Sequence, residues 1–145
     1  MVKKIFFALS IMILFTYGQA MATEQVFDSK IGKFSIDVPD NWTAKKVTEG
    51  CKINSDDNMN SMTLQIVRTN SSLQDLSLMI AKAMGMNIKE NKLIKDNENF
   101  LGGDVNGTAF AIYTIKYDEF FLISICGGAD KKTMDSIRDS AKQVK

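Results

Sequence analysis

Apolar and polar residues alternate along much of the chain with the period of two that β-strands show. In residues 33–38, three apolar side chains predict a buried face, while Ser35 and Asp37 predict a polar outer face. A turn at residues 28–32 joins this strand to an earlier one. Further stretches with strand character are residues 26–27, 51–54, 62–69 and 92–95.

The chain's only proline and only tryptophan lie at the end of the alternating stretch 33–38. Pro39 cannot donate a hydrogen bond to a sheet, so it predicts the end of the strand. Asp40 and Asn41 are typical turn residues. We therefore expect Trp42 to fold back over the edge of the core, since most tryptophans in small domains are packing residues.

The third quarter of the chain predicts a meander of antiparallel strands. Asn106 and Gly107 tolerate the positive φ angles of a tight hairpin turn, so they indicate a hairpin that leads into a strand at 108–117. Residues 120–126 are almost entirely apolar. Such a run predicts a central strand that is covered on both faces.

Two segments show helical spacing instead. One follows the possible N-caps Ser71 and Ser72 and ends near Gly85, and the other follows Asp130. The apolar stripes expected on these helices are Leu73, Leu76, Ile80 and Ala83 for the first, and Met134, Ile137, Ala141 and Val144 for the second. We predict an α+β fold, a mostly antiparallel sheet covered by two amphipathic helices.

The corner F-x-I-x-x-P-x-x-W, formed by Phe34, Ile36, Pro39 and Trp42, and the order of the elements resemble the PsbP-like superfamily. The resemblance covers almost all of residues 24–145. The superfamily includes the extrinsic photosystem II protein, a yeast Ran-binding nuclear-import factor and bacterial exported proteins of the DcrB type. It implies an α-β-α sandwich and a non-enzymatic accessory protein that binds a partner complex. None of the superfamily's functional residues can be matched onto this chain.

The N-terminus has the pattern of a secretory signal peptide. Lys3 and Lys4 precede an apolar run at 5–15, and Ala20-Met21-Ala22 predicts cleavage after Ala22. The apolar run is shorter than the approximately 20 residues of a membrane span, although an uncleaved anchor is the alternative. We expect residues 1–22 to be removed and residues 23–145 to form one domain, periplasmic or secreted and not inserted in the membrane. The first cysteine is Cys51, so no lipid-attachment cysteine follows the signal.

Charge gives no sign of a polyanionic partner. Residues 1–22 contain two of the 18 basic side chains and none of the 17 acidic ones, so the cleaved chain has a net charge of −1. This balance argues against binding to nucleic acid or to an anionic membrane surface. The composition leaves the oligomeric state open.

The two cysteines, Cys51 and Cys126, form an even set in an exported chain. An oxidising compartment favours one disulfide between them. The alternative is two buried free thiols.

The chain contains no histidine, which removes the usual general base and the commonest zinc ligand. No nucleotide-binding or nucleophile motif is present either, so we predict a protein that is not an enzyme and needs no cofactor. A small hydrolase with paired carboxylates is the alternative. The adjacent pair Asp118-Glu119 fits that role poorly, because neighbouring residues at a hairpin tip point away from each other.

The polar segment 55–61 and several of the methionines raise two alternative metal hypotheses, calcium and copper. Asp56, Asn58 and Asn60 have the 1-3-5 spacing of a calcium loop, but the glycine and glutamate required at positions 6 and 12 are absent. Soft copper(I) could use the methionines Met59, Met62, Met84 and Met86. Methionine also fills irregular core gaps, so we predict no metal site and keep copper as an alternative.

Loops on a rigid sheet often carry binding function. The residues we expect to contact a partner are therefore Trp42, Asp56, Asp57, Asn58 and Asn60. The sequence as a whole predicts an accessory protein of the bacterial periplasm or cell envelope that binds another protein.

Overall fold

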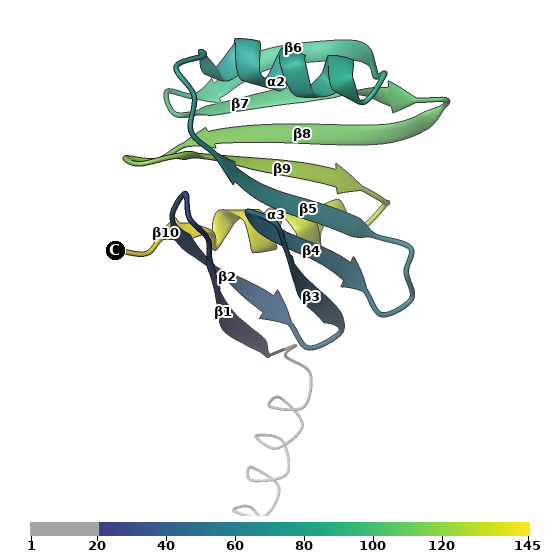
Figure 1. Cartoon of the computed structure of the whole chain (residues 1–145). Coiled ribbons are helices and arrows are strands. Elements are labelled where there is room, and N and C mark those ends of the chain that lie inside the picture. The colour runs from purple at the N-terminus through teal and green to yellow at the C-terminus, as the bar shows by residue number, and fades with distance from the viewer. Residues whose placement is uncertain (1–20) are drawn as a thin grey trace, which may run out of the picture.

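The computed structural model describes residues 21–145. Residues 1–20, with nearly all of the predicted signal peptide, lie outside the described residues (Figure 1). Among the helices that the structure describes, none has both the length and the apolar character needed to cross a membrane.

Within residues 21–145, two antiparallel sheets and two helices make up the fold. The small sheet contains β1 (Ala22–Asp28), β2 (Lys33–Pro39) and β10 (Lys142–Gln143). The large sheet contains β3 (Trp42–Val47), β4 (Gly50–Ser55), β5 (Ser61–Val67), β6 (Asn87–Lys95), β7 (Glu98–Val105), β8 (Thr108–Lys116) and β9 (Phe121–Gly127). The helices are α2 (Leu73–Ala83) and α3 (Lys131–Asp139). The strand order is β1-β2-β10 in the small sheet and β3-β4-β5-β9-β8-β7-β6 in the large one.

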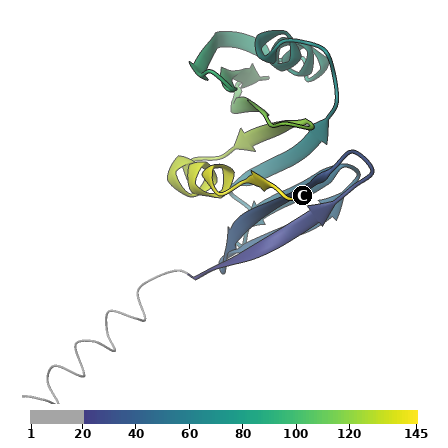
Figure 2. The same cartoon turned by 90° about the vertical axis from the view of Figure 1, so that its left-hand side faces the viewer.

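The large sheet separates two apolar cores. α2 covers β6, β7 and β8 on one face, while α3 and the small sheet cover the other (Figures 1 and 2). β9 is the fourth of the seven strands in the large sheet. Its Leu122 points into the core between the two sheets, while Phe121 and Ile123 point into the core on the α2 side. This confirms both the predicted α+β fold and the central, doubly covered strand.

The corner between the two sheets also agrees with its prediction. β2 ends at Pro39, and Trp42 begins β3 with only 5% of its surface exposed. Two backbone hydrogen bonds tie the corner down, from Asp40 N–H to the Met21 carbonyl and from Asp56 N–H to the Asn41 carbonyl. The turn residues thus direct the tryptophan ring into the core.

The C-terminus differs from its prediction. α3 ends at Asp139, so Ala141 and Val144 do not extend its apolar stripe. The chain instead becomes β10 and pairs with β2, where Lys142 lies opposite Ser35. Ser35, predicted to face water, is therefore fully buried.

α2 begins and ends as predicted, but its buried face is rotated. The Ser72 side chain accepts a hydrogen bond from Asp75 N–H, and Gly85 takes the left-handed φ of 68° just past the end. Ala83 is exposed, whereas Ser77 is buried on the sheet side. Ser77 fits there because it joins a buried polar cluster with Thr114 and Asn99, at 2.8 and 2.9 Å.

The predicted hairpin at Asn106 and Gly107 joins β7 to β8, but the range of β7 was not predicted. Gly102 and Gly103 both lie inside this strand. A Cβ on Gly103 would lie 2.1 Å from the Asn87 carbonyl oxygen of β6. The glycine is therefore required by the close approach of the two strands.

The predicted disulfide is not formed. Cys51 and Cys126 are both free thiols, and both are buried. Cys51 lies in β4 and Cys126 in β9, and β5 runs between these strands. Two strand spacings amount to about 9.5 Å. A disulfide requires Cα atoms within about 7 Å, so the sheet itself keeps the two thiols apart.

Candidate functional site

The predicted binding loop between β4 and β5 lines a polar recess of about 240 Å³. Asp56 and Asn58 contribute to it, and the adjoining strands add Thr43, Lys45 and Asn54. The recess is open and has a mixture of charges. The structure therefore brings together two of the five predicted contact residues.

The other loop residues stabilise the loop itself. The Asp57 carboxylate accepts hydrogen bonds from the Ser55 hydroxyl and from Met59 N–H, which lower its pKa below the usual range. Asn60 is buried, and its side-chain oxygen accepts a hydrogen bond from Asp130 N–H at 2.8 Å. That oxygen is thus already used to fix the start of α3, which leaves the calcium-like pattern without its third ligand.

Trp42 does not line this recess, and its ring packs in the core between the two sheets. The methionines of the copper alternative are also separated. Met62 lies in the core between the two sheets, and Met86 lies in the core between the large sheet and α2. Met59 is 74% exposed. One ion cannot contact thioethers on opposite faces of a sheet, so the structure contradicts the soft-metal alternative.

A second region, beside α3, has more of the features of a binding site. An apolar hollow of about 190 Å³ lies between α3 and the strands β7, β8 and β9. The residues that line it are mainly apolar, namely Phe100, Ala109, Phe110, Ala111, Tyr113, Cys126 and Met134, together with Lys131 and Asp135 of α3. An apolar hollow with a few charged groups is the usual form of a binding pocket.

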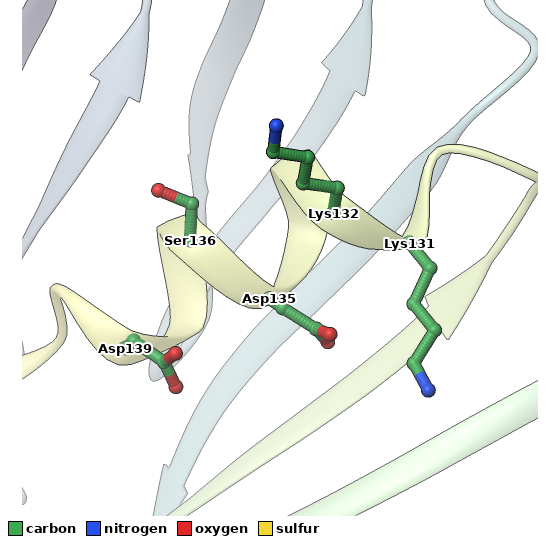
Figure 3. A pocket seen from close by; sticks show the side chains of 5 residues that line it. All are labelled: Lys131, Lys132, Asp135, Ser136 and Asp139. Atoms are coloured by element: carbon green, nitrogen blue, oxygen red, sulfur yellow. The ribbon is translucent and has the colours of Figure 1, made fainter.

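A second, shallow hollow lies along the outer side of α3 and shares two lining residues with the apolar hollow. It occupies about 650 Å³ and is lined by Lys131, Lys132, Asp135, Ser136 and Asp139. Figure 3 shows Lys131 and Asp135 on one side of the helix, with Lys132 and Ser136 pointing the opposite way. Lys131 and Asp135 line both hollows, so the two are continuous along α3.

A buried arginine holds α3 against the sheet. The Arg138 guanidinium lies 3.4 Å from the centroid of the Tyr113 ring, in a cation–π contact. Its Nη1 donates to Asp135 at 2.9 Å, and its Nε lies 3.4 Å from a Glu98 oxygen. Arg138 and Glu98 are 7% and 5% exposed. The helix position is therefore set by a charged cluster in which each buried group has a partner of opposite sign.

Burial also fixes the protonation of the groups at this site. It raises the pKa of the Tyr113 hydroxyl and of the Cys126 thiol, so both are neutral near pH 7. A protonated thiol is a poor nucleophile. The two carboxylates brought together here, Glu98 and Asp135, share Arg138 as their partner rather than forming a free acid–base pair. Asp118 and Glu119, the pair considered from the sequence, are both exposed.

The sequence does not predict this region, because its residues come from three distant segments of the chain. Arg138 is one of only two arginines in the chain and follows Met134 by four residues, which places it on the buried stripe of a helix. That spacing was an available signal for a buried charge. Nothing in the sequence indicates that Glu98 and Tyr113 are its partners.

No protein-family model matches the sequence, and no curated protein matches it. Among solved structures, the chain is similar to cyanobacterial PsbP (CyanoP) from Synechocystis sp. PCC 6803, determined in solution. The two share 13% sequence identity with a TM-score of 0.57, over 88% of this chain and 96% of that one. The chain thus has a PsbP-like fold, as its N-terminal corner and element order indicated.

Proposed function

We propose that this chain is an exported accessory protein of the bacterial periplasm or cell envelope that acts by binding another protein and not by catalysis. The observation that carries the proposal is the apolar hollow beside α3, whose rim holds charges of both signs. Protein interfaces have this organisation, a small apolar centre surrounded by a polar rim. Export is supported by the basic, apolar and small-residue pattern of residues 1–22.

The chemistry of the described residues supports binding over catalysis. The chain has no histidine, and the carboxylates at the hollow are engaged by Arg138. The Cys126 thiol that lines the hollow is kept protonated by burial, which raises its pKa. A PsbP-like fold alone does not specify a function, so the proposal depends on these side chains.

The test is native mass spectrometry of the protein purified from the envelope fraction of its own cells. We expect the mass of residues 23–145, two free thiols and a retained protein partner after mild crosslinking. A full-length chain recovered from the cytoplasm would contradict the export part of the proposal. Hydrolysis of a small substrate that Glu98→Gln abolishes, in a folded variant, would instead support the carboxylate hydrolase.

A further inference from the structure

Three charges at the ends of α3 run against the helix dipole, although the N-cap Asp130 and Arg138 in the last turn agree with it. Lys131 and Lys132 are its first two residues and Asp139 is its last, whereas a helix favours anions at its N-terminus and cations at its C-terminus. Asp139 also follows Asp135, a like charge, by four residues, which is unfavourable, while Lys131 and Asp135 form an opposite-charge pair in the weaker of its two orders. Lys132 and Asp139 therefore contribute less to helix stability than charges of the opposite sign would.

The described residues offer these charges little compensation. Within residues 21–145, neither Lys131 nor Lys132 has a carboxylate within 4.0 Å. Asp139 is 66% exposed at its side chain and lies 3.9 Å from Arg138, which already pairs with Asp135 at 2.9 Å. A sequence that breaks a local stability rule without a compensating contact often does so at a functional site.

The apolar hollow lies directly beside this row of charges. Small side chains, Ala109 and Ala111, line it together with the larger Phe100 and Met134. Its volume of about 190 Å³ suits one aliphatic or aromatic side chain. Buried anchors of this kind, inserted into a pocket and surrounded by polar contacts, contribute most of the affinity in many interfaces.

We infer that the hollow and the outer side of α3 form the docking surface for a partner protein, an inference that rests on the proposed function. The partner places one apolar side chain in the hollow, separate acidic groups against Lys131 and Lys132, and a basic group against Asp139. This arrangement pairs each uncompensated charge of α3 with its opposite. It also fixes the direction of the partner segment along the helix.

The mixed signs favour a protein over other occupants. Asp135 lies at the rim of the hollow and Asp139 on the same helix, and both would repel a phosphate-rich surface such as nucleic acid or an anionic membrane. A protein can match both signs in order along one segment. Complementary charges of this kind give specificity and direction to an interface.

Site-specific photo-crosslinking in the organism's own cells tests the inference. The photoreactive p-benzoylphenylalanine replaces Ala109 in the full chain, and the matched control places it at Met79, which is 60% exposed on α2, on the other face of the large sheet. We expect a crosslink from position 109 to another protein, with an acidic residue close to the crosslinked apolar one. The double variant Lys131→Glu/Lys132→Glu should reduce this crosslink by about tenfold or more.

The outcomes separate the inference from the proposed function. A crosslink at position 109 that is unchanged by the charge reversal, or one to lipid, nucleic acid or a second copy of this chain, would overturn the inference. A protein crosslink from position 79 but not from position 109 would also overturn it, while the proposed binding function would stand. If neither position crosslinks to a protein and native mass spectrometry gives a bare monomer, both fail. Circular dichroism of each variant confirms that α3 remains folded.

Discussion

The Arg138 guanidinium of α3 lies 3.4 Å from the centroid of the Tyr113 ring in β8. The same group reaches Glu98 of β7 at 3.4 Å, so one side chain connects the C-terminal helix to two strands of the large sheet. Arg138 is 7% exposed. Because screening by solvent is small at such a site, the contacts of this arginine matter more to stability than those of a surface ion pair.

Arg138→Met should destabilise the protein by about 3 kcal/mol, because removal of one partner leaves a buried charge without compensation. Glu98 would keep only the exposed Lys95, whose ammonium lies 3.6 Å away. Urea denaturation followed by tryptophan fluorescence of Trp42 measures the change. Adding Glu98→Gln to Arg138→Met should recover part of the loss, since the unpaired charge is then removed.

Arg68→Met is the matched control. Arg68 is exposed and donates one hydrogen bond of 3.3 Å to the Glu119 carbonyl. Its loss should change the free energy of unfolding by no more than about 0.5 kcal/mol. Equal losses for the two arginine variants would show that the cluster around Arg138 is not a specific determinant of stability.

Local sequence patterns were sufficient to predict the elements whose signals come from residues close together in the chain. The hairpin at Asn106 and Gly107, the cap at Ser72 and the apolar strand β9 each depend on neighbouring residues, and each was predicted. The range of β7 was not predicted, because two glycines interrupt its alternation and only the closeness of β6 explains Gly103. β10 was missed for a related reason, since its pairing with β2 joins residues far apart in the chain.

The candidate site was less predictable than the fold. Polarity and loop position led to Asp57 and Asn60, which stabilise the loop and the start of α3. The hollow beside α3 depends on which strands become neighbours, so Phe100 and Met134 meet there only in the folded chain. The order of strands in an antiparallel sheet with long-range pairings is not encoded in any single window of the sequence.

Gly103→Ala should destabilise the protein by about 2 kcal/mol or more, because the new methyl group would overlap the backbone of β6. The Cβ would lie 2.1 Å from the Asn87 carbonyl oxygen, and backbone cannot move aside as a side chain can. The control is Gly102→Ala, whose Cβ would meet the tip of the Phe100 ring at 2.9 Å. Thermal denaturation should show a clearly larger decrease for position 103, and a similar decrease at both positions would contradict the close-approach argument.

The Cys51 thiol should make stability depend on pH in the alkaline range. Burial raises its pKa to about 12, whereas the thiol of the unfolded chain ionises near 9. Below pH 9 the thiol is protonated in both states, and its contribution to stability is fully present. As the pH rises from 9 to 12 only the unfolded state loses the proton, so up to about 1.4 kcal/mol is lost per pH unit.

Cys51→Ala should remove this part of the pH dependence while it lowers stability at pH 7 through the cavity it creates. Urea denaturation at several pH values between 8 and 11 gives the two slopes, and a steeper slope for the unmodified protein is expected. Identical slopes would mean that the folded thiol ionises as easily as the unfolded one. The same samples test the cysteines, since both should react with maleimide only after unfolding.

The reversed charges of α3 predict a conflict between stability and binding. Lys132→Glu removes a cation from the N-terminus of the helix and supplies an anion, so it should stabilise the protein by about 0.3–1 kcal/mol. Lys131→Glu should stabilise it less, because it also replaces the opposite-charge (i, i+4) pair of Lys131 and Asp135 with two like charges. Lys82→Glu is the mirror control, because Lys82 lies in the last turn of α2, where a cation is favourable and its reversal should destabilise. Thermal denaturation at low ionic strength measures all three variants, and 1 M salt should reduce each difference in stability, since it screens exposed charges.

If the lysine reversals in α3 are neutral or destabilising, those lysines make stabilising contacts, and their position would no longer argue for a partner. If they stabilise the protein while the crosslink at position 109 is lost, the chain retains two unfavourable charges because the partner requires them.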